Sequence, residues 1–392
     1  MTLDLGAVSR QIRAMTVELK DNESDFLDRV TRAREALNRW ADRHEVLRAL
    51  VEEQASNLRG AAALAALPLE RLTARYAVPP IPGEHIVLAA DSSTIPPDRH
   101  STAVYYLINV GSAVLHYGET PAAFLDSRPN LYYREQDLII KGEEEVPVRG
   151  SRLEIKSILS EVEQLVALAQ ARPPGHPAVA LLDYPLILWI LEENKDFVQR
   201  YFLEPYLGFL EVLRELDVPI AGYVSQPRYA EVAGLARVAL CPEQPPACRP
   251  CLKRDTPPPC DVIARVMDRN IFAVLAPGER TGLFLSRSEI LKRYPATICF
   301  FYLNVGHEIA RVEVPIWVTR NPALLDRVHA VIYDQAQKGN GYPYALARAH
   351  EQAVVSYMDR ERFSELVTSA LLRQGLPVHL SEKQRSKARR AV

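Results

Sequence analysis

The sequence predicts an α/β fold, a mixed sheet flanked by helices, because two short apolar segments each end in an aspartate and a long amphipathic segment separates them. The first, Ile86–Ala90, follows a proline-rich breaker and precedes Asp91. The second, Ala178–Leu182, precedes Asp183. Short continuous apolar runs bounded by turn residues are typical of buried strands. A buried carboxylate at the end of such a strand is unfavourable unless it binds a metal, pairs with a cation or caps a helix.

Composition limits the class of protein. The 392 residues are enough for one large core with an appendage, or for two domains. Lys and Arg number 47 against 49 Asp and Glu, so a nucleic-acid surface would have to be a local patch. No apolar run approaches the roughly 18 residues of a membrane span. We therefore expect a cytoplasmic protein.

Residues 1–78 are expected to form a helical region. Before a break at 21–25, apolar residues recur three and four apart, as in a coiled-coil seam: Leu5, Val8, Ile12, Met15 and Leu19. After the break the seam resumes out of phase at Phe26, Val30, Ala33, Leu37, Trp40, Leu47 and Val51. This pattern predicts two helices, packed as a hairpin or against another subunit. A helical cap on the main domain and a dimer or partner arm explain it equally well.

A proline cluster at 79–83 separates this region from the main predicted domain, residues 84–375. Strand-like segments 104–110 and 113–117, separated by Gly111-Ser112, predict a hairpin, and residues 119–149 are polar. A helix follows, with one apolar face: Ile155, Ile158, Leu159, Val162, Leu165, Val166 and Ala169. Further helices are expected at 196–216, in a short segment that ends at 240, at 322–337 and in a segment that begins at 343. Strands are expected at 220–225, 297–303 and 310–318. The basic tail, 381–392, has no apolar face and is predicted to be disordered.

The order of these elements matches the ribonuclease H-like scaffold. Nuclease chemistry there needs acids at the ends of the first and fourth strands, another on the first helix and a ligand from a later helix, because two divalent ions lie roughly 4 Å apart around one phosphate. Asp91 and Asp183 fit the strand ends. Glu154 fits the helix, although Ser151-Arg-Leu-Glu154 also fits a capping box, and Glu161 lies one heptad later.

His350 is the candidate for the later ligand. It follows Leu346 by four residues and precedes Val354 by four, so we expect it to face inward. A lone inward histidine is more often a satisfied core residue than a metal ligand. The accompanying carboxylates favour the ligand.

These motifs resemble those of the NurA nucleases of DNA end processing. The resemblance rests on short segments in a fixed order over about residues 85–360: Ala-Ala-Asp91-Ser-Ser, Arg152-Leu-Glu154, Leu-Leu-Asp183-Tyr-Pro-Leu, Gly222-Tyr-Val-Ser-Gln-Pro-Arg228 and Gly341-Tyr-Pro-Tyr-Ala-Leu-Ala-Arg-Ala-His350. Two positions depart from the family pattern, which often has glycine where Ser92 stands and lysine where Gln226 stands.

The resemblance implies a manganese- or magnesium-dependent DNA nuclease that acts as a 5′-3′ exonuclease and single-strand endonuclease in end resection for recombination repair. It also implies a homodimer docked on a hexameric HerA-type ATPase. By the same resemblance Asp91, Glu154, Asp183 and His350 are catalytic residues and metal ligands. They are expected to bind two ions, one that activates a water molecule and one that stabilises the leaving oxygen.

Other residues near the motifs are candidates for DNA binding. Four arginines, Arg149, Arg152, Arg228 and Arg348, are suited to steering the backbone, although arginines in such places are usually solvated or salt-bridged. Tyr132 and Tyr133 suit either stacking on a single strand or packing in the core. The sequence contains no Gly-x-x-x-x-Gly-Lys-Ser/Thr loop, so ATP-driven translocation would need a partner.

A cysteine-rich insertion at 241–260 predicts a second metal site. Cys241, Cys248, Cys251 and Cys260 lie in a proline-rich stretch with little apolar sequence around them. Four thiols in this setting indicate a structural site for zinc or, alternatively, an iron–sulfur cluster; free surface thiols are the simpler reading. Cys299 lies in a predicted strand and is expected in the core.

Three functions compete on these observations: a manganese-dependent nuclease, a non-catalytic adaptor that keeps the fold to dock on a motor, and a nucleic-acid-binding module centred on the cysteine segment. The complete set of acids favours the enzyme.

Overall fold

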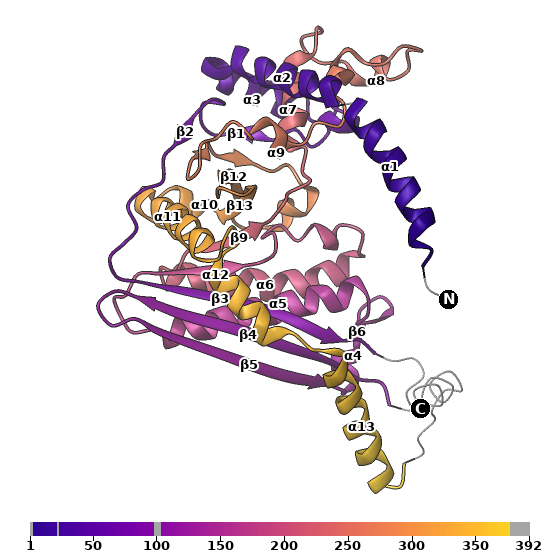
Figure 1. The fold of residues 1–392 in the computed structure, drawn as a ribbon, viewed down its shortest axis with the longest axis vertical. Helices are drawn as coiled ribbons and strands as arrows, with labels where there is room; N and C mark the ends of the chain where they lie inside the picture. Colours follow the sequence, from indigo (N-terminus) through magenta and orange to yellow (C-terminus); the bar gives the residue numbers. More distant parts are fainter. Residues whose placement is uncertain (1–2, 22, 98–102, 377–392) are drawn as a thin grey trace. The chain divides into compact units, whose positions relative to one another are not determined.

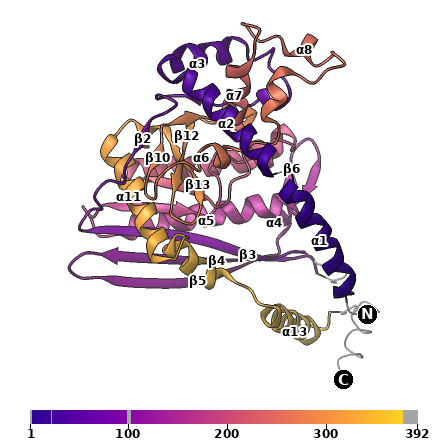
Figure 2. The same cartoon turned by 45° about the horizontal axis from the view of Figure 1, so that its top comes forward.

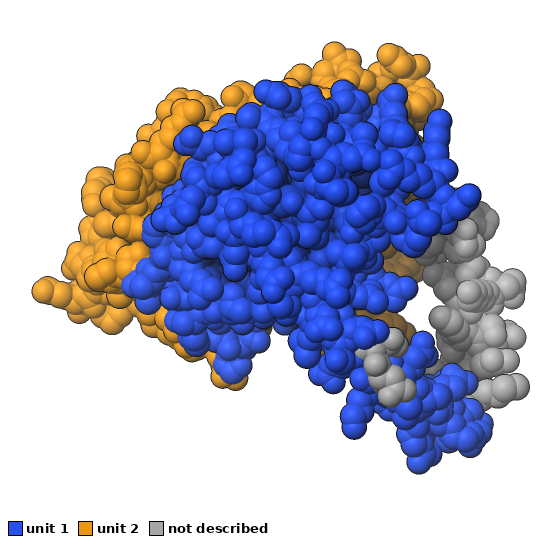
Figure 3. All heavy atoms as spheres, turned by 90° about the horizontal axis from the view of Figure 1, so that it is seen from above, with its two compact units in different colours: residues 1–78, 225–291, 298–312 blue, residues 79–224, 292–297, 313–392 orange. Residues whose placement is uncertain are grey.

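The computed structural model describes residues 3–21, 23–97 and 103–376, so the predicted basic tail lies outside the described residues. The chain divides into two compact units (Figure 3). The first contains residues 1–78, 225–291 and 298–312; the second contains residues 79–224, 292–297 and the chain from 313. The N-terminal helices thus share a unit with the cysteine segment.

The second unit is built on a mixed sheet, which confirms the predicted α/β class. Its strands are β3 (His85–Ile95), β4 (Tyr106–Tyr117), β5 (Ala122–Tyr132), β8 (Ala178–Leu182) and β9 (Ile220–Val224). They lie in the order β9-β8-β3-β4-β5, and β3, β4 and β5 form the long strands of Figures 1 and 2. The β3–β8 and β8–β9 pairs are parallel, whereas β3–β4 and β4–β5 are antiparallel.

Helices cover this sheet. α5 (Ser151–Ala171) packs against β3 and β4, and its buried face contains all seven apolar residues predicted from the spacing. α6 (Asp196–Glu215) packs on α5, and α12 (Tyr344–Ala353) packs on β3 and β4. The remaining helices and short strands of this unit are α4 (Glu135–Leu138), β6 (Ile139–Lys141), β7 (Glu145–Pro147), η3 (Trp189–Leu191), α10 (Ile316–Thr319), α11 (Pro322–Lys338) and α13 (Tyr357–Arg373).

The first unit has its own hydrophobic core. Helices α2 (Glu23–Arg39) and α7 (Glu231–Leu240) pack together, and residues of the predicted second seam, Val30, Ala33, Leu37, Leu47 and Val51, are buried there. The other elements are α1 (Leu5–Asp21), η1 (Ala41–Arg43), α3 (His44–Glu53), η2 (Gly60–Ala62), β1 (Leu67–Pro68), β2 (Arg75–Tyr76), α8 (Cys248–Cys251), η4 (Pro259–Ile263), α9 (Asp268–Ile271), β10 (Arg280–Thr281), β11 (Phe284–Leu285), η5 (Glu289–Arg293) and β12 (Ile298–Asn304). Strand β13 (Ile309–Pro315) runs from this unit into the second.

The two N-terminal seams behave differently. The second is buried as expected, but Ile12, Met15 and Leu19 of α1 are about half exposed or more in the described chain. The region contains three α-helices rather than two, because residues 40–43 interrupt the second predicted helix. These residues of α1 are therefore exposed rather than packed in a helical hairpin.

Gly111 does not form the predicted turn. β4 runs without a break from Tyr106 to Tyr117, and a Cβ atom added at Gly111 would lie 2.2 Å from the backbone nitrogen of Ala353 and 2.3 Å from the carbonyl oxygen of Ala349. The glycine is therefore needed for the close approach of α12 to the sheet. β4 instead forms a hairpin with β5. The sequence did not predict β5, which lies in the polar segment 119–149, because its residues are exposed on both faces and show no apolar alternation.

None of the described helices is both long enough and apolar enough to cross a membrane.

We expect Gly111→Ala to lower the free energy of unfolding by about 2 kcal/mol or more, the scale of overpacking, because the new methyl group meets the backbone of α12. Denaturant unfolding of purified protein measures this. Gly83→Ala is the control, because no atom lies within 4 Å of its added Cβ position. Equal stability of the two variants would show that α12 does not need the close approach.

Candidate active site

The two predicted aspartates occupy the end of one parallel ladder. The β3–β8 register pairs Ile86 with Ala178 and continues to Ala90 with Leu182, so Asp91 and Asp183 are the next residue on each side. β8 ends there, whereas β3 continues to Ile95 paired with β4. Asp91 is thus not the last residue of its strand, as the sequence predicted, but the first beyond its pairing with β8. The chain topology therefore brings the two aspartates together at the carboxyl end of the β3–β8 ladder.

Asp91 contacts the helix that carries His350. The imidazole Nδ1 lies 2.6 Å from Asp91 Oδ2, and the other oxygen of Asp91 accepts a hydrogen bond from the Ser92 amide at 2.8 Å. The side chain of Asp91 is 18% exposed and that of His350 is 63% exposed. His350 is therefore a surface residue, not the inward residue expected, and it still meets the predicted carboxylate.

Side-chain contacts position α12 for this pairing. The Asn109 amide donates to the carbonyl oxygens of Gln352 and Ala353, at 3.1 and 2.9 Å. Asn109 lies on β4, two residues before Gly111, so the same strand supplies both the space and the anchor for the end of α12. His350 consequently has a fixed backbone beside Asp91.

Glu161 approaches from α5. The Ser92 hydroxyl donates a hydrogen bond to Glu161 Oε1 at 2.5 Å. Burial raises the pKa of the Glu161 carboxyl well above its usual range; the Ser92 hydrogen bond lowers it, and the charges of Asp91 and Asp183 raise it further. Asp91 and Asp183 therefore lie close enough to Glu161 to raise its pKa.

Glu154 lies in the first turn of α5 and is exposed. The Tyr184 hydroxyl lies 3.5 Å from Glu154 Oε1. Burial, followed by the charge of Glu154, raises the pKa of Tyr184 to about 12, and Glu161 also contributes. The N-cap of α5 is Gly150, which has no side chain, and not Ser151. Ser151 and Glu154 therefore do not form the capping box that the sequence offered as the alternative. Tyr184 thus lies near both candidate glutamates.

The donor set suits a hard divalent cation. Carboxylate oxygens with one imidazole are ligands that Mn²⁺ and Mg²⁺ accept, and a cation would offset the burial and the like charges that raise the pKa of Glu161. Asp91, Glu161, Asp183 and His350 would hold it. Within the described ranges, no group of three or more His, Cys, Asp and Glu side chains is already arranged around a common ion position. Binding would therefore require the side chains to close in.

The predicted DNA-binding arginines have separate surroundings. Arg149 is exposed, Arg152 donates to the Pro147 carbonyl at 2.8 Å, and Arg348 pairs with Glu351 at 2.5 Å. Arg228 is exposed and belongs to the first unit.

The two tyrosines also differ. Tyr132 stacks on Tyr106 with ring centroids 4.8 Å apart, as the core interpretation requires, whereas Tyr133 is 59% exposed.

Two residues of the site were not identified from the sequence, Ser92 and Tyr184. Each directly follows a predicted aspartate. Both lie inside the motifs, but the partners that give them a role lie on α5, 69 residues from Ser92 and 30 residues from Tyr184.

Comparisons with known proteins agree with this architecture. The NurA-domain family model matches residues 85–355, which include every residue of the site. A structure described as the NurA nuclease from Sulfolobus solfataricus is similar with a TM-score of 0.52 and 12% sequence identity, over 95% of this chain and 98% of that one. A comparison with curated proteins gives no match. Because the family model covers most of its length, the chain belongs to the NurA family.

Proposed function

We propose that this protein is a manganese-dependent DNA nuclease whose ions bind at the carboxyl end of the β3–β8 ladder. The observation that carries the proposal is the juxtaposition of Asp91, Asp183 and the buried Glu161, with His350 on Asp91. Membership of the NurA family supports it. Magnesium is the alternative ion, and two ions are proposed.

The strand order supports a ribonuclease H-like arrangement. Three antiparallel strands, β5, β4 and β3, are followed across the sheet by two parallel ones, β8 and β9. The acids then lie on β3, directly after β8 and on α5 between them, that is, at the first and fourth of these five strands in chain order and on the intervening helix, as that scaffold requires. We propose this fold type for the second unit.

The proposed roles follow from the contacts. Asp91 and Asp183 offer carboxylate oxygens at the carboxyl end of the β3–β8 ladder, and Glu161 offers one from α5. The hydrogen bond from Ser92 fixes the orientation of Glu161. His350 orients Asp91 and completes the ligand set. Bound ions of this kind lower the pKa of a water molecule and stabilise a leaving oxygen. We place Glu154 at the rim, where it acts through Tyr184.

The finer biology is proposed from the family. We propose 5′-3′ exonuclease and single-strand endonuclease activity in DNA end resection for recombination repair, as a homodimer with a HerA-type hexameric ATPase in the cytoplasm. The exposed seam of α1 is compatible with such contacts. Arg149 and Arg152 lie just before and at the start of α5 and, with Arg228 and Arg348, are proposed to contact the DNA backbone.

Asp91→Asn is expected to reduce manganese-dependent cleavage of single-stranded DNA at least about a hundredfold, because it removes a negative charge from the ion site while preserving side-chain shape. Asp326→Asn, at an exposed position of α11, is the matched control. Initial rates are compared after circular dichroism has shown equal folding. Unchanged cleavage by Asp91→Asn would overturn the site.

The non-catalytic adaptor makes the opposite prediction for the wild-type protein. Absence of cleavage with manganese, both alone and with a HerA-type partner, would favour the adaptor.

A pair of variants distinguishes the two glutamates of α5. Glu161→Gln is expected to reduce the rate about a hundredfold, whereas Glu154→Gln costs no more than about tenfold, the smaller loss typical of an outer residue. The reason is that Glu161 is buried beside Asp91 and Asp183, whereas Glu154 is exposed. The reverse order of rates would assign the ligand to Glu154.

A further inference from the structure

The cysteine segment of the first unit has almost no core of its own. Of residues 241–260, only Pro246 is buried, and the only helix within the stretch is the four-residue α8. Yet Cys241, Cys248, Cys251 and Cys260 are all partly buried and free of disulfides. Hydrophobic burial therefore does not account for the fold of this stretch.

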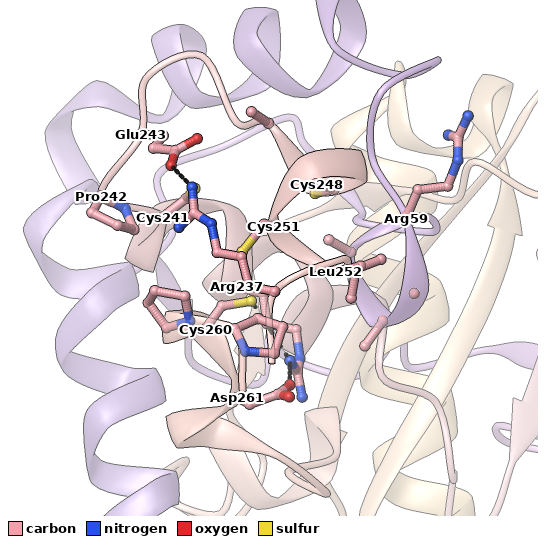
Figure 4. Close-up of a pocket in the computed structure, with 17 residues that line it drawn as sticks. Arg59, Arg237, Cys241, Pro242, Glu243, Cys248, Cys251, Leu252, Cys260 and Asp261 are labelled. Carbon is pink, nitrogen blue, oxygen red and sulfur yellow. Dashed lines mark hydrogen bonds and ion pairs between the residues drawn. The ribbon is translucent and has the colours of Figure 1, made fainter. Parts of the chain in front are cut away.

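The four cysteines line one cavity of about 170 Å³. Cys241 directly follows α7, Cys248 and Cys251 are the first and last residues of α8, and Cys260 lies in η4. Figure 4 shows the sulfur atoms of Cys251 and Cys260 on the same hollow. Cys248 also influences the charge state of both Cys241 and Cys260, whose thiol pKa values burial raises. The four thiols thus converge from three separate elements.

Two of these elements are anchored to the core of the unit. Val232, Leu235, Ala236 and Val238 of α7 are buried, as is Ile263 of η4. Arg237 of α7 also pairs with Asp261 at 2.6 Å, and its guanidinium lies 3.8 Å from Cys260 Sγ. Cys241 and Cys260 therefore have fixed backbones, and α8 is the part that needs to be held.

We propose that Cys241, Cys248, Cys251 and Cys260 form a four-thiolate zinc centre that fastens α8 to α7 and η4. Four thiolates at one point are the ligand set of structural zinc, and its binding energy substitutes for a missing core. The sulfur atoms line the hollow without yet surrounding a common ion position in the described structure. Zinc binding draws them together, which the lightly packed segment permits.

Metal analysis of the purified full-length protein, produced with both zinc and iron supplied, tests this proposal. We expect about one zinc ion per chain and no visible absorption band. Cys248→Ser/Cys251→Ser is expected to lose the zinc. Cys299→Ala is expected to keep it, because Cys299 is buried in β12 and does not line the cavity.

Each other outcome contradicts part of the assignment. Iron with a visible absorption band would overturn zinc in favour of an iron–sulfur cluster. Four freely reactive thiols without metal, or a disulfide, would overturn the metal centre itself. Zinc retained by the double variant would place the ion elsewhere.

Limited trypsin digestion gives a second readout, independent of nuclease activity. Lys253 and Arg254 are exposed and lie between the third and fourth cysteines. Chelation of the wild-type protein is expected to speed cleavage there several-fold, because local opening exposes the segment. The double variant should be cut at the faster rate with or without the chelator. Cleavage insensitive to zinc in the wild type would show that no metal fastens α8.

Discussion

The burial of the Glu161 carboxyl beside Asp91 and Asp183, at the end of the β3–β8 ladder, is the constraint on which the proposed site depends. The parallel register places Asp91 and Asp183 together, and α5 adds Glu161 in a buried position. Burying a carboxylate beside like charges costs several kcal/mol unless a proton or a cation compensates. The raised pKa of Glu161 expresses this cost. A divalent cation at the proposed site would compensate this cost.

The rest of the second unit brings two helices, α5 and α12, to this point. α5 reaches β3 through Glu161 and Ser92, and α12 reaches it through His350 and Asp91. The α12 contact depends on a residue without a side chain, Gly111, and on the Asn109 anchor. The serine that follows Asp91, where the family often has glycine, holds Glu161 in this chain. Serine in place of glycine at this position therefore adds a hydrogen bond to Glu161.

The sequence was sufficient to predict the elements whose apolar residues repeat with the period of a helix or strand and are buried in the fold. It predicted the α5 face and the two apolar strands, because burial requires apolar residues there. It did not predict β5, whose residues are nearly all exposed, or the role of Gly111, because a glycine that admits a helix and one that forms a turn look alike. Glu154 and Glu161 point in similar directions one heptad apart, so only tertiary packing separates the buried residue from the exposed one.

The central claim is that the ions bind among Asp91, Glu161 and Asp183. Anomalous X-ray scattering from manganese in crystals of the wild-type protein tests it most directly. The account predicts manganese peaks within coordination distance of oxygens from these three side chains, with His350 adjacent. Manganese bound only beside Glu154, or no manganese at the end of the β3–β8 ladder at saturating concentration, would contradict it.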